Sequence, residues 1–311
     1  MLVSVIVCTH SLHNYQNLTD AVDSLLNQTH RELEIIIVVD GNQELYNRIV
    51  RVYDGQKKIK VVVIKENVGL SAARNTGIRA ARGDFIAFMD DDAIAEERWV
   101  QNLVDTYQKV DAIAVGGKIL PIWLTRRPDY LPEELGWLVG VTHEGFAGEK
   151  VAEVRNTFGP NMSFKREVFE KVGLFNEKLG FAKRGTSYLQ GEEAEFTLRM
   201  KQKLGQGVIY NPEAVVYHKI SGSKTKPKTL LRRAFYQGYS KALLKRLNLS
   251  SEALTTEGSY LKSLVFKYIP RRIKRIFSAS NSAMELKKLS LLAAVILIVG
   301  LGFLYGYVKR M

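Results

Sequence analysis

The sequence predicts an α/β protein with a mostly parallel central sheet, and three observations lead to this fold class. Short apolar runs typical of buried strands alternate with helix-like segments over roughly the first 115 residues. Polar side chains follow directly on several of these runs, as expected where parallel strands end at a binding crevice. The chain has 311 residues, of which 46% are apolar, so it can bury a large core.

The expected elements follow in order along the chain. Strands are expected at residues 2–8, 33–39, 59–64, 85–89 and 112–115, and helices at 15–28, 44–53, 70–82 and 97–109. After about residue 120 the alternation ends, and the Pro-, Trp-, Gly- and Tyr-rich residues 121–148 are expected to form loops around a site. Further helices are expected at 165–171 and 192–203, and short strands at 208–210 and 214–217. No GxGxxG follows the first strand, so the usual dinucleotide fingerprint is missing.

The positive charge of the chain lies in its last third. The net charge is +13, but residues 219–311 carry 19 Lys and Arg against 3 Glu, while residues 1–218 are slightly acidic. A nucleic-acid-binding protein is not expected, because the basic segment adjoins an apolar one and anionic lipid suits both. The single cysteine, Cys8, excludes an internal disulfide framework.

Leu289–Val308 is a run of 20 residues without a charge, flanked by lysines and an arginine. As a helix it would be about 30 Å long, which matches the hydrocarbon core of a bilayer. It is therefore expected to be a transmembrane anchor, with a buried core helix as the alternative. Residues 260–277 mix aromatic, aliphatic and basic side chains, which is typical of a helix in the headgroup region, expected to break at Pro270.

The expected organisation is thus a catalytic domain at 1–220, a basic membrane-associated helical segment at 221–287 and an anchor at 288–309. The basic residues before the anchor favour the cytoplasmic side of the cell membrane, so a single-pass protein with a cytoplasmic catalytic domain is expected. The alternative for the basic segment is a solvated face.

The expected strand 85–89 ends in three consecutive carboxylates, Asp90, Asp91 and Asp92. Adjacent acids repel each other unless positive charge lies among them, and a divalent cation that bridges phosphate oxygens would supply it. The alternative is an acidic start to the next helix, with Asp92 near its N-cap.

Other polar residues end neighbouring strands. Thr9 follows the first strand and Asp40 the second, and Asn67 precedes a glycine turn and a helix that carries Arg74. Each has an ordinary structural explanation, but all are expected at the same sheet edge as the three aspartates. His218 ends the last strand and is either a metal or diphosphate contact or a buried structural histidine.

These segments together resemble the family 2 glycosyltransferases. The matching motifs are Val5–His10, Ile37–Gly41, Glu66–Gly77, Phe88–Asp92, Gly159–Ser163 and Gly191–Glu193, in the family's order. The resemblance implies the GT-A nucleotide-sugar-binding fold and an inverting transfer from a nucleotide-diphosphate sugar, with a UDP-sugar as the expected donor. It implies Mg²⁺ or Mn²⁺ held by Asp92 and Asp90, with His218 as a further candidate ligand. The implied donor-nucleotide contacts are Thr9, Asp40, Asn67, Arg74, Asp90 and Asp91.

Gly191-Glu192-Glu193 resembles the family's Gly-Glu-Asp, whose last acid is the catalytic base. Glu193 replaces that Asp and keeps the carboxylate with one more methylene, so the base is Glu193 or Glu192. A helix start enriched in acids is the structural alternative. Asn161 is a candidate contact to the acceptor or the sugar, and Trp137 is a candidate for stacking on a sugar ring, with a loop core as its alternative.

The anchor predicts the acceptor. An acceptor head group carried by a lipid lies at the membrane, and a general base is needed for a hydroxyl but not for a lipid phosphate that is already anionic. The expected acceptor is therefore a hydroxyl of a polyprenyl- or dolichyl-linked saccharide. Within the family, the chain resembles archaeal glucosyl-dolichyl phosphate glucuronosyltransferase-like enzymes. The alternatives are a polyprenyl-phosphate sugar synthase and a non-catalytic, membrane-tethered sugar-binding protein.

Overall fold

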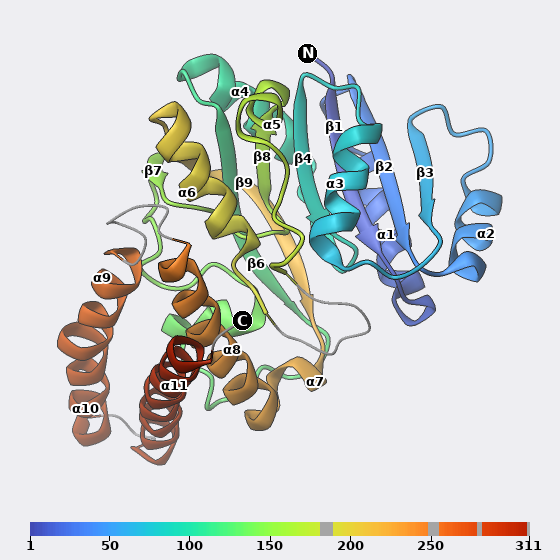
Figure 1. The fold of residues 1–311 in the computed structure, drawn as a ribbon. Coiled ribbons are helices and arrows are strands. Elements are labelled where there is room, and N and C mark those ends of the chain that lie inside the picture. Colours follow the sequence, from blue (N-terminus) through green and yellow to red (C-terminus); the bar gives the residue numbers. More distant parts are fainter. Residues whose placement is uncertain (181–188, 248–254, 279–281, 310–311) are drawn as a thin grey trace. The chain divides into compact units, whose positions relative to one another are not determined.

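The computed structural model describes residues 1–180, 189–247, 255–278 and 282–309 (Figure 1). These residues belong to two compact units. The described parts of 1–120, 149–188 and 192–219 form the first unit, and those of 121–148, 189–191 and 220–311 form the second. The expected division into a catalytic domain, a basic segment and an anchor stays a prediction.

The described strands form one nine-stranded sheet, whose first half is parallel (Figure 1). Strands β3, β2, β1 and β4 lie side by side in parallel, and the β4–β8, β8–β6, β9–β5 and β9–β7 pairs are antiparallel. In sheet order the strands are β3 (Ile59–Ile64), β2 (Leu33–Asp40), β1 (Val3–Thr9), β4 (Phe85–Asp90), β8 (Met162–Lys165), β6 (Ala114–Trp123), β9 (Val208–Ile220) and β5 (Ala93–Ala95), with β7 (Ala152–Val154) beside β9.

Helices cover both faces of this sheet, because its central strands are apolar on both sides. Val3, Val5 and Val7 of β1 join one buried cluster, while Ile6, between them, joins the other, as the two-residue repeat of a strand requires. Helices α1 (Tyr15–Leu26), α2 (Gln43–Val52) and α4 (Trp99–Lys109) contribute to the first cluster; α3 (Leu70–Ala80), α5 (Arg166–Val172) and α6 (Glu192–Leu204) contribute to the second.

Two expectations about the later elements were wrong. The two strands expected between residues 208 and 217 are one continuous strand, β9, because side-chain bonds support its middle: Asn102 donates to the Glu213 carbonyl and Asn211 to the Thr106 hydroxyl. Residues 121–148 are not all loop, since β6 continues to Trp123 and η2 (Glu133–Val139) is helical. Apart from these two corrections, the apolar C-terminal helix α11 (Ser282–Val308) contains the whole apolar run and begins seven residues before it.

The helix expected to break at Pro270 continues through it. Helix α9 (Thr255–Ser263) passes through a π-helical turn, η4 (Leu264–Tyr268), into α10 (Ile269–Ser278). Proline has no N–H and its ring crowds the carbonyl four residues earlier, and a wider turn just before it relieves both problems. The remaining helices of the second unit are α7 (Gly222–Thr225) and α8 (Pro227–Arg246).

A buried arginine holds three parts of the second unit together. Arg272 of α10 is 0% exposed and donates to Glu134 of η2 at 2.6 Å and to Glu285 of α11 at 2.9 Å. It also bonds Glu133 at 3.1 Å. Removing one partner of such a cluster leaves buried charge without compensation, which is strongly destabilising.

We therefore expect Arg272→Met to destabilise the second unit by about 3–5 kcal/mol, the usual effect of breaking a buried ion pair. Lys274→Met is the matched control, because Lys274 lies on the same helix and is exposed. Thermal unfolding of the purified full chain in detergent measures both. Equal unfolding temperatures for the two variants would contradict the structural role of Arg272.

Candidate active site at the carboxyl edge of the sheet

The parallel strands bring the predicted donor residues to one edge. In the parallel register, Cys8 pairs with Asp90 and Thr9 with Val39, so Thr9, Asp40 and Asp90 end three adjacent strands at the same level. The structure thus brings Thr9, Asp40 and Asp90 together at this edge, where we expected them from the sequence.

Asp40 fixes the loop that leads into α3. One of its carboxylate oxygens accepts the Val68 N–H at 2.8 Å and the other accepts the Gly69 N–H at 3.0 Å. Asn67 donates to the Asp40 carbonyl at 3.3 Å. Gly41 adopts a φ of +74°, and a Cβ there would lie 2.2 Å from the Asn67 nitrogen, so only glycine allows this approach. Asp40 and Asn67 therefore form one rigid loop at the edge.

Asp91 turns toward β1. Its carboxylate accepts the Thr9 hydroxyl at 2.7 Å and the Asn14 side-chain amide at 3.4 Å. Burial, followed by repulsion from Asp92, raises the pKa of Asp91 to about 7. Thr9 and Asp91 are thus hydrogen-bonded to each other in this structure, and among the described residues the group of possible metal ligands contains Asp90 and Asp92 but not Asp91.

Arg74 is the centre of the charged site. Its side chain is 3% exposed, and its guanidinium lies 3.1 Å from Glu192, 3.5 Å from Glu193 and 3.7 Å from Asp90. It also lies over the Phe88 and Phe175 rings, at 5.9 and 5.8 Å from their centroids. One buried cation therefore connects the acid at the end of β4 to both acids at the start of α6.

The two glutamates differ in their surroundings. The Glu192 side chain is 2% exposed, and its Oε2 has no hydrogen-bond partner among the described residues. Burial, followed by repulsion from Glu193, raises the pKa of Glu192 to about 8. The Glu193 side chain is 19% exposed, so it is the more accessible of the two carboxylates.

Two glycines allow the loops to approach these acids. A Cβ at Gly159 would lie 2.4 Å from Nη2 of Arg74 and 2.8 Å from Oε1 of Glu193. A Cβ at Gly180, whose φ is +95°, would lie 2.7 Å from the Ser71 hydroxyl and 3.4 Å from the Glu192 carboxyl carbon. Any side chain at Gly159 would displace the arginine or the glutamate.

Asp90, Asp92 and His218 form a candidate metal site. One ligand atom from each lies within 4.8 Å of the others, and Nε2 of His218 is 3.1 Å from Oδ1 of Asp92. The histidine comes from β9, where it pairs with Ala93 of β5, directly after Asp92. Two carboxylates and an imidazole fit Mn²⁺, and Mg²⁺ would use mainly the carboxylates.

Lys219 is a residue of this edge that sequence reasoning missed. Its backbone N–H donates to the Asp92 carbonyl at 2.9 Å, and its side chain pairs with Asp20 of α1 and lies 3.3 Å from Asn17. The position of Lys219 directly after His218 could have indicated its place at this edge, and Gly159 begins the motif Gly159–Ser163, whereas nothing in the sequence indicated the contact of Asn14 with Asp91.

The two predicted acceptor contacts, Asn161 and Trp137, have hydrogen-bond partners within the chain. Asn161 is fully buried, accepts from the Trp99 indole at 2.9 Å and donates to the carbonyls of Lys118 and Ala214. Trp137 belongs to the second unit, where its indole donates to the Tyr260 hydroxyl at 3.0 Å. The structure gives both side chains internal partners, and their roles in acceptor binding stay predictions.

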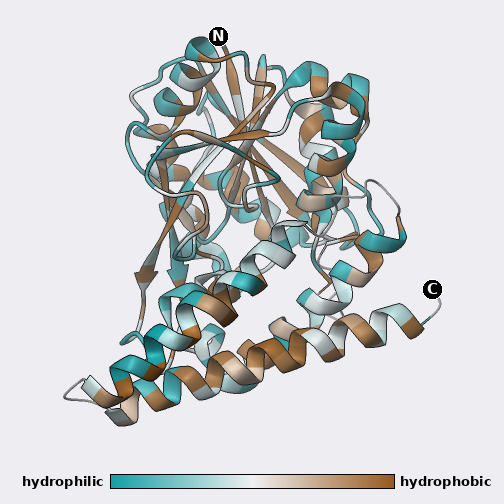
Figure 2. Ribbon diagram, turned by 90° about the vertical axis from the view of Figure 1, so that its left-hand side faces the viewer, coloured by the Kyte–Doolittle hydropathy of each residue, from teal (hydrophilic) through white to brown (hydrophobic). Residues whose placement is uncertain are grey.

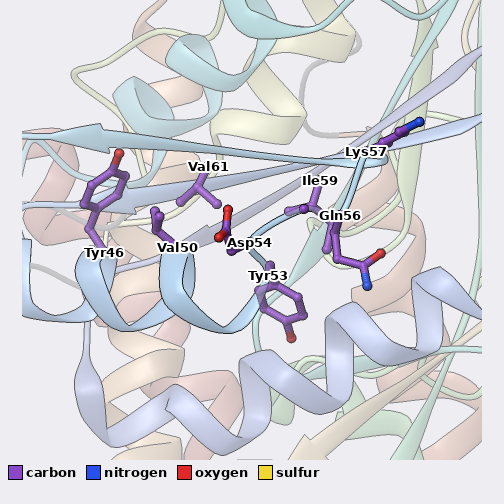
Figure 3. Close-up of a pocket in the computed structure, with 9 residues that line it drawn as sticks. Tyr46, Val50, Tyr53, Asp54, Gln56, Lys57, Ile59 and Val61 are labelled. Atoms are coloured by element: carbon purple, nitrogen blue, oxygen red, sulfur yellow. The ribbon is translucent and has the colours of Figure 1, made fainter.

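A separate pocket lies beside β3, which is the first strand in the order of the sheet. It has a volume of about 450 Å³ and contains no predicted site residue (Figure 3). Its lining is Tyr46, Val50, Tyr53, Asp54, Gly55, Gln56, Lys57, Ile59 and Val61.

Comparisons with known proteins agree with this fold and sequence. The family model described as "Glycosyl transferase family 2" matches residues 4–173. A glucosyl-dolichyl phosphate glucuronosyltransferase of Haloferax volcanii is 39% identical over 307 residues, which cover 98% of this chain and 96% of that protein.

Two solved structures share the fold at 18% identity. The mannosyltransferase PcManGT of Pyrobaculum calidifontis, solved with GDP-Man and Mn²⁺, has a TM-score of 0.64 over 97% of this chain and 87% of that chain. TarS of S. aureus, solved with UDP-GlcNAc, has a TM-score of 0.56 over 96% of this chain and 82% of that chain. The predicted GT-A fold class is confirmed, and this chain belongs to glycosyl transferase family 2 and is a glycosyltransferase.

Proposed function

We propose that the chain is an inverting, metal-dependent glycosyltransferase that moves a sugar from a nucleotide-diphosphate sugar to a hydroxyl of a polyprenyl- or dolichyl-linked saccharide. The observation that carries this proposal is the buried Arg74, which joins Asp90 to Glu192 and Glu193. The proposed donor-side acid, Asp90, and the proposed acceptor-side acid, Glu193, thus both lie beside the Arg74 guanidinium. The name of the Haloferax volcanii relative supports a dolichyl phosphate-linked substrate.

The donor occupies the carboxyl edge of the sheet. The nucleoside lies against Thr9, Asp40 and the Asn67 loop, and the diphosphate lies near Asp90, Asp91 and Arg74. The bound UDP-GlcNAc of TarS and GDP-Man of PcManGT support a nucleotide sugar. We propose UDP as the nucleotide.

Asp92, Asp90 and His218 would hold Mg²⁺ or Mn²⁺, and the Mn²⁺ in the PcManGT structure supports such an ion. When bound, the ion would neutralise negative charge on the diphosphate leaving group. Arg74 adds a fixed positive charge at the same place, at no reorganisation cost during the reaction.

Glu193 is the general base in this proposal. The acceptor hydroxyl oxygen forms a bond to the anomeric carbon, the bond from that carbon to the diphosphate breaks, and Glu193 takes the hydroxyl proton. Attack from the side opposite the diphosphate inverts the anomeric carbon. Glu193 is chosen over Glu192 because its carboxylate is the more exposed. Glu192 is the positioning residue that holds Arg74.

The second unit supports a membrane location. Among the described residues, α11 is the helix long and apolar enough to cross a membrane, and it is mostly brown and white in Figure 2, where it leads to the C-terminus. The basic residues of 221–287 favour the cytoplasmic face, where lipid-linked acceptors are accessible to nucleotide sugars. Asn161 and Trp137 remain proposed acceptor-side residues.

The glutamates can be assigned by substitution. We expect Glu193→Gln to lower the transfer rate by about 10²–10⁴-fold, the usual contribution of a general base, and Glu192→Gln to lower it far less. The assay follows nucleoside diphosphate release and the lipid product, with a lipid-linked monosaccharide or bare polyprenyl phosphate as acceptor. Near-normal transfer by Glu193→Gln would exclude it as the base, and product from the bare phosphate would favour the sugar synthase.

The metal site can be tested without turnover. Asp92→Asn should weaken Mn²⁺ binding at least about 10-fold, because it removes a charged ligand. Electron paramagnetic resonance of free Mn²⁺ in a titration of the full chain measures this. Asp54→Asn is the control, because Asp54 is exposed and is not one of the candidate ligands. This variant should bind Mn²⁺ with the same affinity as the unchanged protein. Equal affinities for all three proteins would place the ion elsewhere.

Gly159 lies so close to Arg74 and Glu193 that a side chain at this position should reduce activity. Gly159→Ala should reduce the transfer rate about 10²-fold, because the added methyl group shifts Arg74 or Glu193 from its position. Gly258→Ala is the matched control, since a Cβ there meets nothing within 4 Å. Unfolding temperatures establish that both variants fold. An active Gly159→Ala enzyme would show that the Arg74–Glu193 geometry does not limit the reaction.

A further inference from the structure

Helix α11 packs closely against α8 of the same chain. A Cβ at Gly302 would lie 2.0 Å from the Phe235 carbonyl oxygen, and a Cβ at Gly238 would lie 1.9 Å from the Val299 carbonyl oxygen. Gly306 likewise meets Tyr239 and Ala242. Glycines on both helices are what allow the two backbones to approach this closely. Gly302 and Gly306, which form a GxxxG pair on α11, therefore pack against α8 of the same chain.

The two helices run in the same direction. Phe235 lies at the level of Gly302, Tyr239 and Ala242 at the level of Gly306, and Arg246 reaches the last turn of α11. Its guanidinium donates to the carbonyls of Lys309, at 2.7 Å, and Tyr307. The C-terminal end of α11 is thus capped by an arginine of α8.

The first turn of α11 is also fixed to charged residues of the second unit. Glu285 bonds the buried Arg272 of α10, which bonds Glu134 of η2. Arg233 of α8 donates to the Leu138 carbonyl of the same η2 at 2.7 Å. Both ends of α11 are therefore connected to η2 by charged side chains of α8 and α10.

Helix α8 is too polar to enter the hydrocarbon core. It carries Arg232, one turn before Phe235 and so near the level of the middle of the apolar run, and Lys241, which pairs with Glu257 of α9 at 2.7 Å. Lys245 and Arg246 follow at its end. If α11 crossed a bilayer while docked on α8, these charges would lie at membrane depth, where charged side chains are costly.

Outside these contacts, α11 and the η4–α10 segment expose large apolar side chains. On α11, the exposed side chains include Leu297, Leu301, Leu304 and Val308, which recur at helical spacing along one face. On the η4 and α10 segment, Phe266 and Phe277 are 78% and 87% exposed, and basic residues such as Lys274 and Arg275 lie among them. Exposed aromatic and aliphatic side chains beside lysines and arginines match an anionic lipid surface.

We propose that α11 stays docked on α8 and lies within one leaflet of an anionic bilayer, and does not cross it. Its apolar face, with Phe266 and Phe277, enters the leaflet, and both of its ends stay on the side of the membrane that holds α8, α10 and η2. Composition alone predicted a crossing, but a crossing would require α11 to leave the glycine contacts, Arg246 and the Arg272 cluster. The inference does not depend on the reaction that the site performs.

Cysteine labelling tests the topology. Lys309→Cys places a thiol directly after the last residue of α11, and Met311→Cys is a separate variant two positions further along the sequence. Arg51→Cys, on the exposed face of α2, reports the side of the first unit. Sealed membrane vesicles of both orientations, from cells that express the full chain, are treated with a membrane-impermeant maleimide before and after detergent. The unchanged chain gives the background from Cys8, and an unfolding temperature equal to that of the unchanged chain establishes that each variant folds.

We expect position 309 or 311 to be labelled in the same vesicle orientation as position 51, and in the other orientation only after detergent. Labelling of positions 309 and 311 from the face opposite to position 51 would overturn the proposal and establish a crossing helix. Failure of glycosyl transfer with correct labelling would count against the proposed reaction alone.

Discussion

The site depends on one buried guanidinium. Arg74 has almost no access to solvent, so its charge is stable there only because Asp90, Glu192 and Glu193 surround it. The same contacts fix the start of α6 relative to the end of β4, two segments about a hundred residues apart in sequence. The guanidinium also lies over the aromatic rings of Phe88 and Phe175. The acids on the two sides of the site are thus held at a set spacing.

The carboxylates outnumber the cations at this edge. Asp90, Glu192 and Glu193 surround one arginine, and Asp92 lies beside His218. The raised pKa of Glu192 reflects burial and repulsion from Glu193. Such an excess of negative charge favours binding of a divalent cation. It also means that the donor's diphosphate would bind poorly without that ion, so metal and donor binding are expected to be coupled.

Strong local patterns in the sequence predicted most of the fold and part of the site. The apolar runs located the parallel strands, and their polar ends located Thr9, Asp40 and Asp90, because parallel strands end at one edge. Long-range contacts had no local pattern: the link from Arg74 to Glu192 and the burial of Asn161 between Trp99 and two carbonyls depend on how distant segments meet. The packing of α11 on α8 could not be predicted from the sequence for the same reason. An apolar composition is typical of a membrane span and also of a helix that is covered on one face.

The most direct test is a crystal structure of the full chain with a nucleoside diphosphate and Mn²⁺, in which anomalous scattering locates the ion. The account predicts a single strong peak in coordination contact with Asp92, with the diphosphate between the ion and Arg74 and the nucleoside beside Asp40. A peak and a nucleotide bound away from Asp90, Asp92 and His218 would contradict it.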